Sequence, residues 1–328
     1  MATSLVYFFK LNQLVKIKDL LPKFTQPIGV KVHFGEQGNV TFIPADLIRF
    51  IVMLLNQPTL IECSVLYKSP RSTASGHKQV AIEHGFSFTP IDFLDGEAGD
   101  DSVEIKSSGR HFTSCFFGKR LIKYNSLLVI SHFKGHLTAG FGGAIKNLGM
   151  GLASRRGKLA QHASIKHQVD QKKCTGCGYC ITDCPTEAIK FNQVQLAEIN
   201  QAICISCSKC ISICPVEAIN IPWESTTSKD FQEKIAEYAK TAIENKQCYF
   251  INFLINITEL CDCNGSALPI LTPDIGVLAS ADPVAIDQAS YDLVLAQYAE
   301  FNKFNGDDQL NYGEKIGLGS RKYELIKL

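Results

Sequence analysis

The sequence predicts an α/β fold: a discontinuous domain with a mainly parallel or mixed sheet and helices on both faces, carrying an inserted small α+β module. Three observations predict it. Short apolar runs alternate with amphipathic stretches, the cysteine density rises abruptly between about residues 168 and 222, and the strand–helix alternation lapses there and then resumes. We therefore expect residues 1–168 and 223–328 to form the α/β domain and residues 169–222 to form the insertion, because a longer surface loop costs little to close.

Five apolar runs are expected to be buried strands. They are apolar nearly throughout rather than alternating, which strands covered on both faces require. Amphipathic helical stretches lie at 44–55 and 231–245, and Asp282 followed by Pro283 fits the N-cap and first turn of a helix over 283–298. The five runs are IGVKVHF (28–34), TLIECS (59–64), SLLVIS (126–131), CYFINFLINI (248–257) and IGVLAS (275–280).

Composition and charge exclude several classes of protein. With 33 basic and 32 acidic residues the net charge is +1, so the basic excess of a nucleic-acid-binding protein is missing. No apolar stretch approaches the roughly 18 residues of a spanning helix, and no secretory signal is recognisable. We expect a cytoplasmic protein that binds neither nucleic acid nor membrane, in which 13 cysteines serve metal or redox chemistry rather than disulfides.

The insertion contains an internal repeat. CTGCGYCITDCPTEAIK (174–190) matches CISCSKCISICPVEAIN (204–220) at a period of 30 residues, and each half has the pattern C-x-x-C-x-x-C-x-x-x-C-P. This run is typical of a two-cluster ferredoxin, in which three cysteines of one half and the fourth of the other half hold each four-iron, four-sulfur cluster. We predict that cluster I is held by Cys174, Cys177, Cys180 and Cys214, and cluster II by Cys204, Cys207, Cys210 and Cys184.

A pair of zinc sites is the alternative reading of these cysteines. Zinc needs four thiolates or imidazoles per ion, typically supplied as C-x-x-C pairs, and such pairs do not explain the third cysteine of each loop or the following Cys-Pro. Gly176 and Gly178 ease the first loop and leave backbone N–H groups to face sulfide. The second loop has Ser206 and Ser208 instead, so we expect slightly different geometry or hydrogen bonding there.

Chemically capable side chains follow four of the predicted strands. Ligands of open α/β sheets bind beyond the carboxyl ends of the strands, so these side chains predict a cleft there. His33, Gly35 and Glu36 follow the first run, and Asp282 follows the last. The candidates for catalysis, or for binding an additional metal, are Cys261, Asp262, Cys263, His132, Lys134 and His136.

Each candidate has a plainer reading. Cys261 and Cys263, two apart, would point to the same side of an extended strand, which suits metal chelation or thiol redox chemistry; the alternative is two incidental packed thiols. His132 and His136 would suit metal ligation on one helical face, but the Lys-Gly between them favours a loop. A structural or surface role for either histidine stays open.

A glycine-rich segment, TAGFGGAIKNLGMG (138–151), follows a strand and opens a predicted helix. Gly140, Gly142 and Gly143 let backbone N–H groups converge and Lys146 adds positive charge, so the segment suits an anionic ligand. It matches neither the dinucleotide fingerprint nor the Walker loop. A purely structural glycine turn is the alternative.

Long stretches of the chain resemble the domain-of-unknown-function family 362, in the subgroup with an inserted ferredoxin module. They are KVHFGEQGNVTFIP, SHFKGH, GFGGAIKNLGMG, GKLAQH, INFLINITELCDC and DIGVLASADPVAIDQAS, and the resemblance covers nearly the whole chain. It implies an iron–sulfur protein, mostly of anaerobic or facultative microbes, whose reaction is not established. The family's habitual segments match at His33, His132, His136, Gly140 to Gly143, Cys261 to Cys263 and Asp282 to Asp287, and the resemblance assigns them no role.

Two functions compete. In the first, the protein is an iron–sulfur oxidoreductase whose clusters deliver electrons one at a time to a small anionic substrate or a metal site, with Cys261 and Cys263 at the receiving centre. In the second, it is a non-catalytic electron carrier or metallocofactor assembly factor, and the α/β domain docks a redox partner protein. A ferredoxin needs only the module of about 55 residues, so the much larger domain favours the first.

Overall fold

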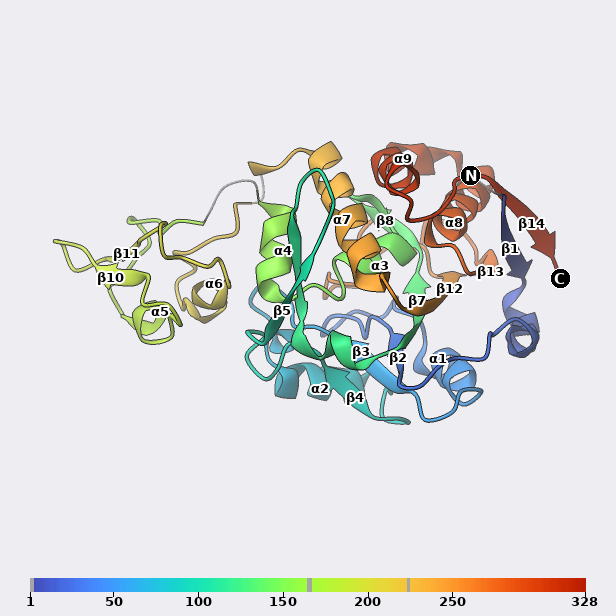
Figure 1. The fold of residues 1–328 in the computed structure, drawn as a ribbon, viewed down its shortest axis with the longest axis horizontal. Helices are drawn as coiled ribbons and strands as arrows, with labels where there is room; N and C mark the ends of the chain where they lie inside the picture. Colours follow the sequence, from blue (N-terminus) through green and yellow to red (C-terminus); the bar gives the residue numbers. More distant parts are fainter. Residues whose placement is uncertain (1–2, 164–166, 223–224) are drawn as a thin grey trace.

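An eight-stranded mixed sheet forms the centre of the molecule (Figure 1). The computed structural model describes residues 3–163, 167–222 and 225–328. In the order β14-β1-β13-β12-β7-β2-β3-β4, five neighbouring pairs are parallel and two are antiparallel. The strands are β1 (Ser4–Phe9), β2 (Ile28–Lys31), β3 (Thr59–Glu62), β4 (Ile91–Phe93), β7 (Ser126–His132), β12 (Gln247–Leu254), β13 (Gly276–Ser280) and β14 (Tyr323–Lys327).

Helices cover both faces of this sheet, as the apolar runs predict. Along β7, Leu127 and Val129 join one hydrophobic cluster, while Leu128 and Ile130 join another on the opposite face. The first cluster is completed by α3 (Ala144–Gly149), α7 (Ser228–Ile243), α8 (Pro283–Gln297) and α9 (Asp307–Lys315). The second is completed by η1 (Leu11–Asp19), α1 (Ala45–Val52) and α2 (Ala74–Glu83).

The five predicted strands and three predicted helices are confirmed. Asp282 caps α8 as expected, since its carboxylate accepts the N–H groups of Val284 and Ala285 at 2.8 and 3.0 Å. Further elements are two hairpins, β5 (Ser102–Lys106) with β6 (Ser114–Gly118) and β8 (Lys134–His136) with β9 (Gly140–Gly142), helix α4 (Arg155–His162), and the short 3₁₀ turns η2 (Pro70–Ser72), η3 (Lys119–Lys123) and η5 (Ala299–Lys303).

Residues 169–222 form a small lobe at one end of the molecule (Figure 1). The lobe contains α5 (Tyr179–Thr182), α6 (Lys209–Ile213) and an antiparallel pair, β10 (Ile189–Phe191) with β11 (Ala197–Ile199). It has a hydrophobic cluster of its own, to which Leu66 and Leu159 of the larger body also contribute. The domain boundary predicted at residue 223 lies outside the described residues.

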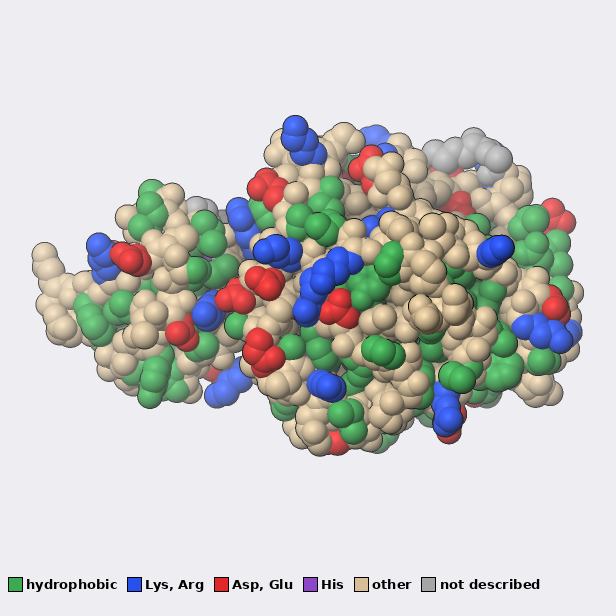
Figure 2. Space-filling view, turned by 60° about the horizontal axis from the view of Figure 1, so that its bottom comes forward, with side chains coloured by type: hydrophobic (Ala, Val, Ile, Leu, Met, Phe, Trp, Pro, Cys, Tyr) green, Lys and Arg blue, Asp and Glu red, His purple; other side chains and the backbone are tan. Residues whose placement is uncertain are grey.

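The surface shows no large patch of one charge on the face seen in Figure 2, where basic and acidic side chains are intermixed. This agrees with the near-zero net charge of the sequence. In the described part of the chain, every helix is too short or too polar to span a bilayer.

Candidate functional site

A cleft of about 280 Å³ lies at one edge of the sheet. Strands β12, β7, β2 and β3 run parallel and are neighbours, so their carboxyl ends meet at this edge, as the sequence predicts. Residues beyond all four strands line the cleft: His33, Cys63, His132, Lys134, His136, Cys261 and Cys263.

Asp282 does not belong to this cleft, contrary to the sequence-based prediction. Strand β13 runs antiparallel to β12, so its carboxyl end lies at the opposite edge of the sheet. There the Asp282 carboxylate accepts a hydrogen bond from Ser4 Oγ at 2.7 Å and from the Ser320 N–H at 2.8 Å. The residue is therefore a helix cap and a tie between chain ends.

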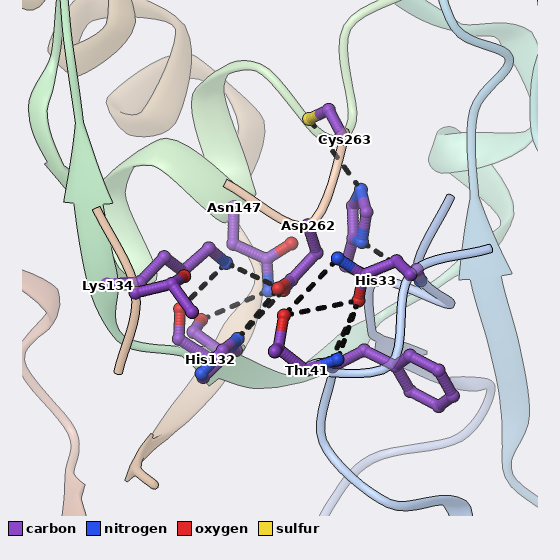
Figure 3. A network of polar contacts seen from close by, with 12 residues as sticks. His33, Thr41, His132, Lys134, Asn147, Asp262 and Cys263 are labelled. Carbon is purple, nitrogen blue, oxygen red and sulfur yellow. Dashed lines mark hydrogen bonds and ion pairs between the residues drawn. The ribbon is translucent and has the colours of Figure 1, made fainter. Parts of the chain in front are cut away.

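Cys261 and Cys263 lie in a turn rather than an extended strand. The Asn264 N–H donates to the Cys261 carbonyl at 3.0 Å and closes the turn. The turn still brings the two thiols together, and they share a hydrogen bond. Cys263 Sγ also lies 4.0 Å from His33 Nε2 (Figure 3).

His136 hydrogen-bonds to Cys261 and has a defined tautomer. Its Nδ1 accepts the backbone N–H groups of Thr138 and Ala139 at 3.2 and 3.0 Å. A neutral ring therefore carries its proton on Nε2, which donates to Cys261. The hydrogen bond from Cys263, together with Lys146 and His136, holds the pKa of Cys261 well below its usual value. The same hydrogen bond and burial raise the pKa of Cys263.

His132, Asp262 and Lys134 form a buried polar network behind the cysteines (Figure 3). His132 Nδ1 lies 2.9 Å from an Asp262 carboxylate oxygen, and His132 Nε2 lies 2.8 Å from the Ile255 carbonyl. Both ring nitrogens thus lie against oxygen acceptors within the protein, and neither is directed at a metal site. Burial opposes ionisation of Asp262, but His132 and Lys134 outweigh it and hold its pKa well below the usual value. We infer that Asp262 and His132 position the Cys261–Cys263 turn.

The lining of the cleft is strongly cationic. Its described residues include Lys31, Arg71, Lys134, Lys146 and Lys158 against one carboxylate, that of Glu62. Lys31 is fully buried, with Nζ 3.0 Å from Glu62 Oε2 and 2.8 Å from Asn147 Oδ1. Burial lowers the pKa of Lys31. The Lys146 side chain makes no ion pair or hydrogen bond within the described ranges, so its charge is available to an anionic ligand.

The glycine-rich segment contributes in part to this lining. Gly142, Gly143 and Lys146 line the cleft, and a side chain at Gly142 would meet the Lys134 and Lys146 side chains at 3.4 and 3.7 Å. The first N–H groups of α3 are not available to an anion, because the Asp287 carboxylate accepts them at 2.7 and 2.9 Å. Gly140 adopts a φ of +77° against the backbone of Asn305, which makes it a structural glycine.

The eight cysteines of the small lobe fall into two groups around two small cavities. Each cavity takes three cysteines from one half of the repeat and the fourth from the other half. The Ala188 and Ala218 N–H groups lie 3.2 Å from the sulfurs of Cys184 and Cys214, respectively, at equivalent places in the repeat. The groups are Cys174, Cys177, Cys180 and Cys214, and Cys184, Cys204, Cys207 and Cys210.

The two cysteine loops both adopt left-handed backbone at two equivalent positions. Gly176 and Gly178 have φ of +68° and +79°, and their counterparts Ser206 and Ser208 have +56° and +65°. The expected difference in hydrogen bonding includes the Ser206 N–H, which lies 3.4 Å from Cys204 Sγ. Serine tolerates the left-handed region at an energetic cost, and Ser208 is fully buried.

Sequence reasoning missed three residues of this region. His162 lines the cleft from the end of α4. His167 Nε2 lies 3.3 Å from Cys210 Sγ in the small lobe. Arg155 is 2% exposed, and its Nη2 donates to the Ser208 carbonyl at 3.3 Å. Of these three residues, only His162 could have been found from the sequence, because it ends the GKLAQH stretch that resembles the family.

The second cysteine loop lies against the larger body next to the cleft. Leu66 lines the cleft and also joins the hydrophobic cluster that contains Cys180 and Cys210. Arg155 contacts the carbonyls of both Leu66 and Ser208, at 3.5 and 3.3 Å. The side chains of Leu66 and Arg155 thus connect the second cysteine loop to the cleft.

Comparisons with known proteins leave the chemistry of this chain open. No functionally curated protein matches the chain. The lactate racemase apoprotein from Thermoanaerobacterium thermosaccharolyticum aligns with 77% of this chain and 51% of its own at 13% identity and a TM-score of 0.39. A Thermotoga maritima protein aligns with 93% of this chain and 58% of its own at 10% identity and a TM-score of 0.40. The chain thus spans little more than half the length of either structure. The model of the DUF362 family, a domain of unknown function, matches residues 28–292, so the chain belongs to that family.

Proposed function

We propose that this protein is an iron–sulfur redox protein in which two four-iron, four-sulfur clusters on residues 169–222 transfer electrons to a small anionic substrate in the cleft. Cluster I would be held by Cys174, Cys177, Cys180 and Cys214, and cluster II by Cys204, Cys207, Cys210 and Cys184. Bound clusters would supply one-electron reduction and oxidation steps.

The observation that carries this proposal is the position of Leu66. It lines the cleft and packs in the hydrophobic cluster that contains Cys180 and Cys210, and Arg155 donates to the Ser208 carbonyl in the second loop, so that loop would hold cluster II on the side of the lobe nearer the cleft. Arg155 supports the same contact from α4. Cys177, in the first loop, is exposed. Electrons from a redox partner would therefore enter at cluster I and leave through cluster II.

The donor set fits iron–sulfur clusters better than zinc. Each group contains four thiols, and backbone N–H groups point at sulfurs, the usual second layer of contacts around a cluster. The run C-x-x-C-x-x-C-x-x-x-C-P is the ligand pattern of a two-cluster ferredoxin, whereas zinc sites typically draw their ligands from C-x-x-C pairs.

Metal and sulfide analysis of protein purified without oxygen tests the proposal. We expect about eight irons and eight acid-labile sulfides per chain, and a brown chromophore that bleaches with dithionite. Stoichiometric zinc with no charge-transfer absorption would end it. If clusters are present but replacing both Cys261 and Cys263 by serine leaves the protein able to complement a deletion strain, the non-catalytic carrier or assembly function gains.

A further inference from the structure

We propose that Cys261 and Cys263 form a redox-active dithiol, in which Cys261 is the attacking thiolate and Cys263 the resolving thiol, acting on a small anionic disulfide. This inference deepens the proposed function and rests on it for the source of electrons. The Cys-x-Cys spacing is compatible with either metal chelation or thiol redox chemistry, and this proposal selects thiol redox chemistry.

The geometry around the two thiols divides the roles between them. Cys261 receives hydrogen bonds from Cys263 and from His136, whose Nδ1 is occupied by two backbone N–H groups. Lys146 adds positive charge beside Cys261. These are the surroundings that stabilise a thiolate. Cys263 is the donor in this pair and keeps its proton, so it attacks second.

The histidines of the cleft disfavour a metal ion at the same place. A metal-bound histidine normally donates its other ring N–H to an acceptor. His136 and His33 do the reverse, because their Nδ1 atoms accept backbone N–H groups, that of Gly35 at 3.1 Å in the case of His33. His33 Nε2 also lies 3.2 Å from Arg71 Nη2, which would repel a cation. Among the described residues, the one group of three metal-ligand donors within 4.8 Å of one another lies elsewhere, at His111, Asp230 and Glu233.

The cationic lining selects an anionic substrate. Lys146 has no ion-pair partner in the part of the chain that the structure describes, and it faces Cys261. Gly142 leaves the space between Lys134 and Lys146 open. A carboxylate attached to the substrate would be drawn through this space to Lys146, because Lys134 is already paired with Asp262, while the substrate's sulfur meets Cys261.

The chemistry balances in two stages. The Cys261 thiolate attacks one sulfur of the substrate, forms a mixed disulfide and releases the first substrate thiolate. Cys263 then loses its proton to solvent, attacks the sulfur of Cys261 and releases the second thiolate, which leaves a Cys261–Cys263 disulfide. Bound and reduced clusters would supply two electrons, one each, which together with one proton would break this disulfide and restore the thiolate and the thiol.

Two disulfide probes test the substrate charge on the cluster-loaded full chain. With dianionic 5,5′-dithiobis(2-nitrobenzoate), the wild type should release two thiolates per chain in a fast phase, Cys263→Ser should release one, and Cys261→Ser should lose the phase. Cys248→Ser is the control, because burial raises the pKa of that thiol to about 12.

The charge of the substrate is tested by comparing two probes. Lys146→Gln should slow the reaction with the anionic probe about tenfold more than the reaction with neutral 4,4′-dithiodipyridine, and Lys146→Arg should restore the preference for the anionic probe. The exposed Lys123→Gln variant should match the wild type. A fast phase that persists in Cys261→Ser would overturn the proposal.

Counting the electrons taken up by the oxidised protein separates the dithiol from the clusters. A photochemical reductive titration should take about four electrons per chain in the wild type, about one per cluster and two for the disulfide, and about two in the Cys261→Ser/Cys263→Ser double variant. About two in both proteins would overturn the dithiol and leave the clusters standing. About two in the wild type and none in the double variant would overturn the clusters and leave the dithiol standing.

Discussion

The guanidinium of Arg155 lies 3.3 Å from the carbonyl oxygen of Ser208 and joins helix α4 of the sheet domain to the second cysteine loop. Arg155 is 2% exposed, so this contact is shielded from solvent. The neighbouring Arg156 instead stacks on the Phe116 ring, 3.5 Å from its centroid. The two adjacent arginines therefore serve different parts of the molecule.

Arg155→Gln should weaken the contact between the small lobe and the larger body without loss of the clusters. We expect an unchanged iron and sulfide content and a several-fold slower oxidation of reduced clusters by a disulfide at the cleft, because electron transfer depends on the contact near Leu66. Stopped-flow absorbance of the chromophore measures that rate. Arg156→Gln is the matched control and should keep the wild-type rate; equal rates in all three proteins would refute a role for the contact.

The crossed arrangement of cysteines makes a prediction about single variants. Cys214→Ser should damage the cluster held by the first loop, and Cys184→Ser the cluster held by the second, because each fourth cysteine lies in the other half's group. Paramagnetic NMR follows the two clusters separately. If each substitution perturbs only the cluster of its own loop, the crossed assignment is wrong.

Asp262→Asn should destabilise the protein. The change leaves the buried His132 and Lys134 without the carboxylate between them, and breaking a buried ion pair from one side costs about 3–5 kcal/mol. Denaturant unfolding measures this loss. The exposed Asp46→Asn variant in α1 should lose about 1 kcal/mol or less. A loss in Asp262→Asn no larger than in this control would show that the network does not hold the turn.

Asp287 gives the stability a pH dependence of known sign. Burial raises its pKa from 3.8 to about 6, so the folded protein binds more protons than the unfolded chain between these values. Stability from this group is therefore lost as the pH rises from about 4 to about 6. The Tm of the wild type should fall more over that interval than the Tm of Asp287→Asn. Asp95, whose pKa is also raised to about 6, is present in both proteins, so parallel pH profiles would contradict the assignment.

The strand positions were predictable because residues buried on both faces form continuous apolar runs. Strand direction was not, since an apolar run carries no polarity along the chain; this is why Asp282 was placed at the wrong edge of the sheet. The edge strand β14 was missed because its residues are partly exposed and alternate less clearly.

The sequence predicted which residues meet in the candidate site, but it did not predict the role of each residue. The parallel strands brought Cys261, Cys263 and His136 to one cleft, as expected from their places after strand ends. The roles of His132 and Asp262 depended on hydrogen bonds to the Ile255 carbonyl and Lys134, which no spacing encodes. Burial of Arg155 likewise depends on the lobe that covers it.

Anomalous diffraction at the iron edge, from crystals grown without oxygen, tests the central claim most directly. The account predicts two separate groups of iron peaks, one among Cys174, Cys177, Cys180 and Cys214 and one among Cys184, Cys204, Cys207 and Cys210, with no metal peak at Cys261 and Cys263. Peaks at the zinc edge in the small lobe with none at the iron edge would contradict the proposed clusters. A metal peak between Cys261 and Cys263 would contradict the dithiol.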